Sequence, residues 1–146
     1  MKSWMLLIAV LLAACAEPDR QVTRVSDDGL FSLRLETDEN RVRPGAELPV
    51  LVTLEYLGPP LDEERVETVD LVANNGTLSE RSLLAIFSPA PSGEAFDPAP
   101  YRQWVSFAAS SRVTTAEQGE VRALLRDIQA VLKIRIDPDP QELLDP

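Results

Sequence analysis

The chain has 146 residues, of which 45% are hydrophobic and 26% charged, and its formal net charge is −10 at pH 7. This length suits one folded domain, and the acidic charge argues against binding to nucleic acid, whose phosphates it would repel. Histidine is absent and Cys15 is the only cysteine. This composition excludes an internal disulfide, nucleophile–histidine catalysis and the usual zinc sites, so we expect no cofactor, no metal and no enzymatic activity.

The first 14 residues have the features of a signal peptide. Lys2 supplies a positive start, and an uninterrupted apolar run from Met5 to Ala14 ends in small residues. The run is shorter than the ~20 apolar residues that a helix needs to cross a bilayer. The alternative interpretation is an N-terminal anchor that is not cleaved.

The end of this run, Leu12-Ala13-Ala14-Cys15, resembles the lipobox of bacterial lipoproteins. The resemblance implies cleavage between Ala14 and Cys15 and attachment of lipid, with acyl chains such as palmitate, to the Cys15 sulfur. More than one acyl chain is needed for stable anchoring. Ala16 in the next position, rather than aspartate, resembles the pattern that sends lipoproteins of diderm bacteria to the outer membrane. We therefore expect a lipid-anchored protein of the cell envelope.

The segment that follows, residues 15–28, is interpreted as the lipidated cysteine and a tether. Residues 16–28 are polar and show no sustained hydrophobic periodicity.

Alternation of apolar and polar residues begins near Gly29 and predicts a domain over residues 29–138. Predicted strands are 30–35, 48–56, one around 66–73, 83–87 and 101–108. Turns are predicted at 38–40, at Pro44-Gly45, at Gly58-Pro59-Pro60 and at the Asn74-Asn75-Gly76 hairpin signal. Residues 88–100 contain four prolines and are predicted to form an exposed loop, and residues 139–146 a loose tail.

The segment 115–136 fits two patterns. Val121, Leu124, Leu125, Ile128 and Leu132 fit one stripe of a helix. A β-hairpin with its turn at Arg126-Asp127 places more apolar residues on one face, from Ile128 to Ile136, and avoids a glycine early in a helix. We favour the hairpin.

About seven short strands separated by turns are typical of a β-sandwich, so we predict an all-β fold. In addition, Arg43-Pro44-Gly45 before 48–56, Val69-Asp70-Leu71 with 75–79, and Thr114-Thr115 with Gly119-Glu120-Val121 are similar to bacterial immunoglobulin-like domains of the invasin/intimin type. The resemblance implies a single immunoglobulin-like β-sandwich with a binding or assembly role. The chain differs from those proteins because it has one domain and a proline-rich loop at 88–100.

Several groups of residues are candidate sites, but each has a simpler interpretation. Acidic residues at 27–28, 62–64 and 137/139 could bind calcium but are more typical of a solvated surface, and no spacing indicates a carboxylate pair of glycosidase type. Tyr101 and Trp104 could form an aromatic platform for a sugar or a strand, but core packing is favoured. The acceptor pattern Asn75-Gly76-Thr77 is interpreted as a hairpin turn.

The sequence therefore predicts a non-enzymatic, lipid-anchored module that meets an envelope protein through loops 58–65 and 88–100 or through an exposed edge strand. A carboxylate-dependent carbohydrate-active enzyme and a purely structural spacer remain the alternatives.

Overall fold

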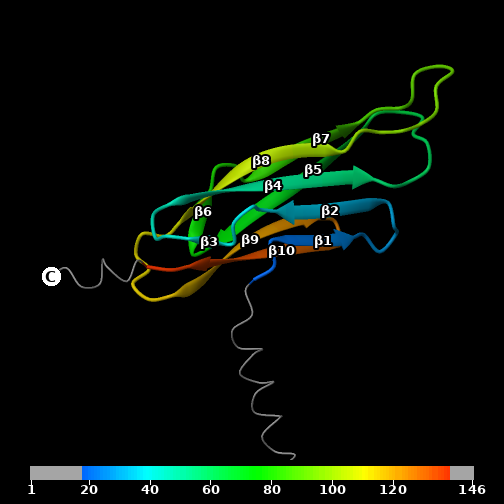
Figure 1. The fold of residues 1–146 in the computed structure, drawn as a ribbon. Coiled ribbons are helices and arrows are strands. Elements are labelled where there is room, and N and C mark those ends of the chain that lie inside the picture. The colour runs from blue at the N-terminus through cyan, green and yellow to red at the C-terminus, as the bar shows by residue number, and fades with distance from the viewer. Residues whose placement is uncertain (1–17, 139–146) are drawn as a thin grey trace, which may run out of the picture.

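The computed structural model describes residues 18–138, which fold into two layers of β-strands (Figure 1). Within these residues ten strands follow one another along the chain: β1 (Gln21–Val25), β2 (Phe31–Glu36), β3 (Arg41–Val42), β4 (Glu47–Tyr56), β5 (Arg65–Asn74), β6 (Gly76–Leu78), β7 (Ser82–Phe87), β8 (Tyr101–Ala109), β9 (Glu117–Leu125) and β10 (Ile128–Ile136). The signal peptide (1–14), the cleavage site between Ala14 and Cys15, and the tail (139–146) lie outside the described residues.

The strands form two five-stranded sheets. The first sheet has the order β1-β2-β4-β8-β6 and the second the order β3-β10-β9-β5-β7. Neighbouring strands are antiparallel except β3 and β10, which are parallel. The order β2-β4-β8-β6 facing β10-β9-β5 is the A-B-E-D and G-F-C order of an immunoglobulin sandwich. The predicted all-β sandwich is therefore confirmed.

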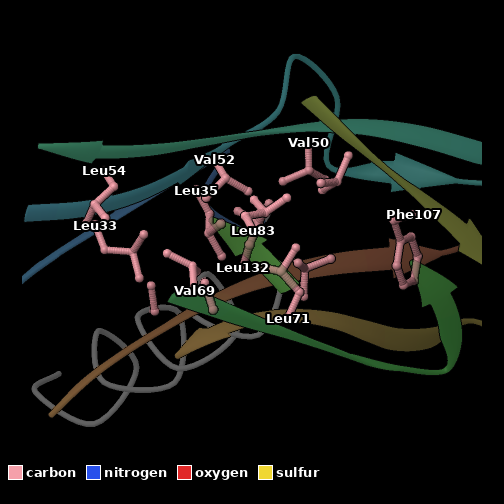
Figure 2. Packing of buried hydrophobic residues seen from close by; sticks show 14 of the residues in the cluster. Leu33, Leu35, Val50, Val52, Leu54, Val69, Leu71, Leu83, Phe107 and Leu132 are labelled. Carbon is pink, nitrogen blue, oxygen red and sulfur yellow. The ribbon is translucent and has the colours of Figure 1, made fainter. Parts of the chain in front are cut away.

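The hydrophobic core lies between the sheets and is built by alternate residues of each strand. Figure 2 shows Leu33 and Leu35 of β2 and Val50, Val52 and Leu54 of β4 packed against Val69 and Leu71 of β5 and Leu132 of β10. All of these side chains are buried. Burying each such side chain stabilises the fold by about 1.5–3 kcal/mol, so the two inner faces hold the sheets together.

Most strand predictions are confirmed. The predicted strands 30–35 and 48–56 correspond to β2 and β4, and residues 88–100 connect β7 to β8 without a strand. For residues 115–136 the hairpin is confirmed and the helix is wrong: β9 pairs with β10 in register from Leu125↔Ile128 onward. Arg126, in the turn, has a φ of 52°.

The interpretation of residues 16–28 as a tether is wrong for Gln21–Val25, which form β1. This strand pairs antiparallel with β2 over its whole length. Even Pro18 is bound to the domain, because its carbonyl accepts a hydrogen bond from Nδ2 of the buried Asn40. The sandwich therefore begins before the predicted boundary at residue 29.

The turn at Asn75 is not a hairpin. Asn75 has a φ of 55°, and it redirects the chain from β5 in the second sheet to β6 in the first. Asn75 Nδ2 donates to the carbonyl of Gln118 at 2.8 Å. A Cβ on the next residue, Gly76, would lie 2.5 Å from the Phe107 ring, so only glycine allows this close crossing between the sheets.

Candidate interaction surface

Four connections gather at one end of the sandwich: 26–30, 57–64, 88–100 and 126–127 (Figure 1). We call this the loop end. Aromatic rings fill it, with the centroids of Phe31 and Tyr56 5.5 Å apart and those of Tyr56 and Phe96 5.9 Å apart. Phe87, the last residue of β7, lies 6.0 Å from Tyr56 by the same measure. The rings therefore attach the 88–100 loop to the ends of the strands.

A buried carboxylate joins β5 to the β9–β10 turn at the loop end. Glu67 of β5 faces inward and is 8% exposed. It accepts hydrogen bonds from Arg126 Nη2 at 2.6 Å and from Arg65 Nε at 3.0 Å. Both guanidinium groups also lie 5.1 Å from the centroid of the Phe31 ring, within cation–π range. The site therefore consists of one carboxylate bound by two guanidinium groups. Within residues 18–138 it does not contain the second carboxylic acid that the predicted alternative, a glycosidase-type pair, requires.

The predicted loop 58–65 lines an open hollow of about 530 Å³. Tyr56, Pro59, Pro60 and Leu61 form its apolar part, and the acidic residues 62–64 lie along it. The Tyr56 hydroxyl donates to the Pro59 carbonyl at 2.8 Å, which fixes the loop against the aromatic cluster. The two loops predicted to meet a partner are thus neighbours in space.

The three predicted acidic clusters are not brought together. Asp28 and residues 62–64 belong to the loop end, whereas Asp137 follows β10 at the opposite end and pairs with Arg135 at 2.8 Å; Asp139 lies outside the described residues. A hydrogen bond from the Ser26 hydroxyl, and a second from the Leu30 N–H, lower the pKa of Asp28. Among residues 18–138 no group of three metal-ligating side chains is placed to hold a metal ion.

The outer strand of the second sheet, β7, has an open edge. The Leu71 N–H donates to the Arg81 carbonyl at 2.8 Å, and the register continues from this pair as Asp70↔Ser82 to Arg65↔Phe87. Because antiparallel ladders alternate, the backbone groups of Ser82, Leu84 and Ile86 point away from β5. No hydrogen bond within the described part of the chain satisfies them.

The same alternate residues present apolar side chains on the outer face. Leu84 and Ile86 are 57% and 51% exposed, and Val66 of β5, directly opposite Ile86, is 49% exposed. We call these three residues the β7 patch. Strand β7 carries no charge and no proline, the features by which proteins usually protect an exposed edge.

Only part of this surface was found from the sequence. An exposed edge strand was predicted in general terms, but β7 was not identified as that strand. The available signal was the run Ser82–Phe87, in which both sets of alternate residues contain large apolar side chains. A strand of this kind has more apolar surface than one sheet interface can bury.

Tyr101 and Trp104 lie on opposite faces of β8 and do not form one platform. Tyr101 packs against the core, and burial raises its pKa, with a smaller contribution from the nearby Glu80. Trp104 is 54% exposed on the outer face of the first sheet. Core packing is therefore the wrong interpretation for Trp104.

The chain matches no known protein family, and no curated protein matches it either. Over residues 18–138, no helix has the length and hydrophobicity that crossing a membrane would require.

Proposed function

We propose that the protein is a lipid-anchored, non-enzymatic module of the bacterial cell envelope that binds an extended segment of another envelope protein along β7. The partner segment adds as a further strand to the second sheet. The observation that carries this proposal is the open, uncharged edge of β7 next to the β7 patch.

The geometry suits strand addition. Three alternate residues, Ser82, Leu84 and Ile86, each present a backbone N–H and a carbonyl to an incoming strand. Main-chain hydrogen bonds supply affinity in this binding mode, and contacts of alternate side chains supply specificity. Leu84 and Ile86 would meet the apolar side chains that the partner presents on the same face. Without a partner, the side chains of Leu84 and Ile86 stay exposed to water. Covering them with apolar side chains of the partner is favourable and therefore stabilises the paired state.

Charge indicates the character of the partner. The chain carries a net charge of −10, so a partner whose residues flanking the apolar segment are basic would be attracted, whereas a second copy of this chain would be repelled. We therefore propose an apolar segment with basic flanks and not self-association. The 88–100 loop continues directly from Phe87 and would contact the partner beyond the end of the added strand.

A substitution that removes one backbone donor tests the proposal. Proline at an edge position whose N–H faces solvent leaves the ladder intact, so Leu84→Pro should abolish strand addition while the domain stays folded. The matched control is Val25→Pro on β1, an outer strand of the first sheet. The alternation of the β1–β2 register also points the Val25 N–H away from β2.

The readout is photocrosslinking in host cells with benzoylphenylalanine at Ser82 of the full chain. We expect one crosslinked band that Leu84→Pro removes and Val25→Pro retains, with both variants melting near the parent. A band that persists in Leu84→Pro would contradict strand addition, as would no band at all. A band at twice the mass of the chain would replace the proposed partner by a second copy.

The membrane anchor is tested separately. The lipobox-like Leu12-Ala13-Ala14-Cys15 implies a lipid on Cys15, and the charge of the chain gives no other attraction to anionic headgroups. Cys15→Ser should therefore move the protein from the membrane fraction to the soluble fraction. Retention of the variant in washed membranes would contradict lipid anchoring, whatever the result at β7.

A further inference from the structure

The outer face of the first sheet carries an exposed tryptophan in a row of polar residues. The registers of β1, β2, β4 and β8 place Gln21, Glu36, Leu51 and Trp104 side by side across the sheet. Leu51 is buried although it points outward, while Trp104 is 54% exposed. One apolar neighbour therefore supports the indole while much of its surface stays open to solvent.

Beside Trp104 lies a hollow of about 200 Å³. It is lined by the indole and by polar residues of two kinds: donors from Arg20 and Gln21, and acceptors from Glu36 and Asp38. Arg20 Nη1 donates to the Asp38 carbonyl at 2.9 Å, and Glu36 pairs with Arg34 at 2.9 Å. These contacts hold the side chains of Arg20 and Glu36 in place beside the hollow.

An adjoining feature of the same face points independently to a missing polar partner. Thr53 of β4, two residues from Leu51 on the same face, is 1% exposed, and its Oγ1 has no hydrogen-bond partner among residues 18–138. It lines a smaller hollow of about 50 Å³ together with Thr23, Ser32, Arg34 and Glu55. A buried hydroxyl without a partner is costly, and a polar ligand or a water molecule in this hollow would satisfy it.

We propose that this face binds a neutral polysaccharide, with one pyranose ring stacked on Trp104 and a neighbouring unit reaching toward Thr53. A pyranose has an apolar C–H face, which suits the indole, and a rim of hydroxyls that both donate and accept hydrogen bonds. The mixed donors and acceptors around Trp104 match that rim. A hollow of 200 Å³ suits one sugar ring of a chain better than a larger compact ligand.

The charge of the site favours neutral over acidic polysaccharides. Three carboxylates, of Glu36, Asp38 and Glu55, line the two hollows together with the guanidinium groups of Arg20 and Arg34. The carboxylates outnumber the cations by one (3 − 2), and the whole chain is strongly acidic. An acidic polysaccharide would therefore be repelled. The proposal is independent of β7, which lies in the other sheet.

Trp104 provides its own readout, because Trp4 is the only other tryptophan. The experiment uses the full chain carrying Trp4→Phe in micelles of a zwitterionic detergent without a sugar headgroup. Emission of Trp104 is followed during titration with chitotetraose, maltotetraose and an acidic oligogalacturonide. We expect a saturable change with a neutral oligosaccharide and none with the acidic one. Chitotetraose alone would indicate N-acetylated glycan as the source, and maltotetraose alone a neutral glucan.

The variant Thr53→Val distinguishes a role of the Thr53 hydroxyl in oligosaccharide binding from a role in the stability of the fold. The substitution keeps the shape and removes the unpartnered hydroxyl, so it should raise the melting temperature while weakening oligosaccharide binding roughly fivefold. Trp104→Ala, followed by calorimetry, should abolish binding, and Gln129→Ala on the outer face of the second sheet should change nothing. No saturable change with either neutral oligosaccharide would overturn the proposal. A shift of Trp104 emission with phospholipid vesicles alone would replace it with contact to a membrane surface.

Discussion

Replacing Glu67 by glutamine measures how much the buried carboxylate contributes to holding the loop end together. Glu67 receives charge-assisted hydrogen bonds from Arg126 at 2.6 Å and from Arg65 at 3.0 Å. Glutamine keeps one acceptor oxygen but turns an NH₂ group toward the guanidinium donors, so at least one of these bonds is lost. A hydrogen bond to a charged group contributes about 1.5–3 kcal/mol. Because the Arg126 side chain is 40% exposed, water compensates in part, and we expect a loss of about 2 kcal/mol.

The measurement is thermal and urea unfolding of the parent, Glu67→Gln, Arg126→Gln and the double variant. A loss of about 2 kcal/mol corresponds to a fall of roughly 8 °C in Tm for a domain of this size. The double-variant cycle should give a coupling of about 1 kcal/mol or more. Glu64→Gln, which removes the same charge from an exposed loop, should stay within about 0.5 kcal/mol of the parent. If Glu67→Gln unfolds like this control, the network does not stabilise the loop end.

Three further predictions concern the fold. Gly76→Ala places a Cβ against the Phe107 ring and should destabilise the protein by about 1–3 kcal/mol, measured by urea unfolding; a neutral result would contradict the close crossing of the two sheets. Leu132→Ala should cost about 2–5 kcal/mol in the same assay, because Leu132 is 1% exposed in the core. The hydrogen bond from Ser26 lowers the pKa of Asp28 below its ordinary value in the folded state. The stabilising effect of this bond is therefore present above the pKa of the unfolded chain and is lost as the pH falls through the folded pKa. The stability difference between the parent and Asp28→Asn should therefore shrink between pH 6 and pH 2, and a difference constant with pH would contradict this assignment.

The strands that could be predicted from the sequence are those with one buried and one exposed face. In β2 the alternation of Phe31, Leu33 and Leu35 with polar residues appears directly as alternating burial. The β9–β10 hairpin was predicted for the same reason. In these elements the local pattern and the tertiary environment agree, so periodicity is sufficient.

Strand β1 could not be predicted in this way because it has almost no buried face. Of its five residues only Val22 is partly buried. Gln21–Val25 form a strand because their backbone is hydrogen-bonded to β2. Backbone pairing of an edge strand does not require alternating apolar side chains, so hydrophobic periodicity does not reveal it. The tether interpretation is wrong because a polar segment can still be ordered by backbone hydrogen bonds, as Gln21–Val25 are.

The candidate surfaces show a second limit. Apolar composition indicates that a residue can be buried but not that the fold has room to bury it. The sandwich has one interface between two sheets, and β7 and β8 each bring large apolar side chains to both of their faces. Leu84, Ile86 and Trp104 therefore remain exposed. Which residues stay exposed depends on the order of the strands in the sheets, and hydrophobic periodicity does not determine that order.

If the protein is lipid-anchored as proposed, the early start of the sandwich limits how far the domain can extend from the membrane. If Cys15 carries lipid as proposed, only residues 16 and 17 separate it from Pro18, whose carbonyl is already bound by Asn40. A fully extended chain from Cys15 to Pro18 spans roughly 10 Å. The domain would then rest close to the bilayer, with little freedom to rotate or search for distant partners. Any protein that pairs with β7 would have to approach within about one domain length of the membrane surface, which makes membrane-bound or membrane-adjacent proteins the expected partners.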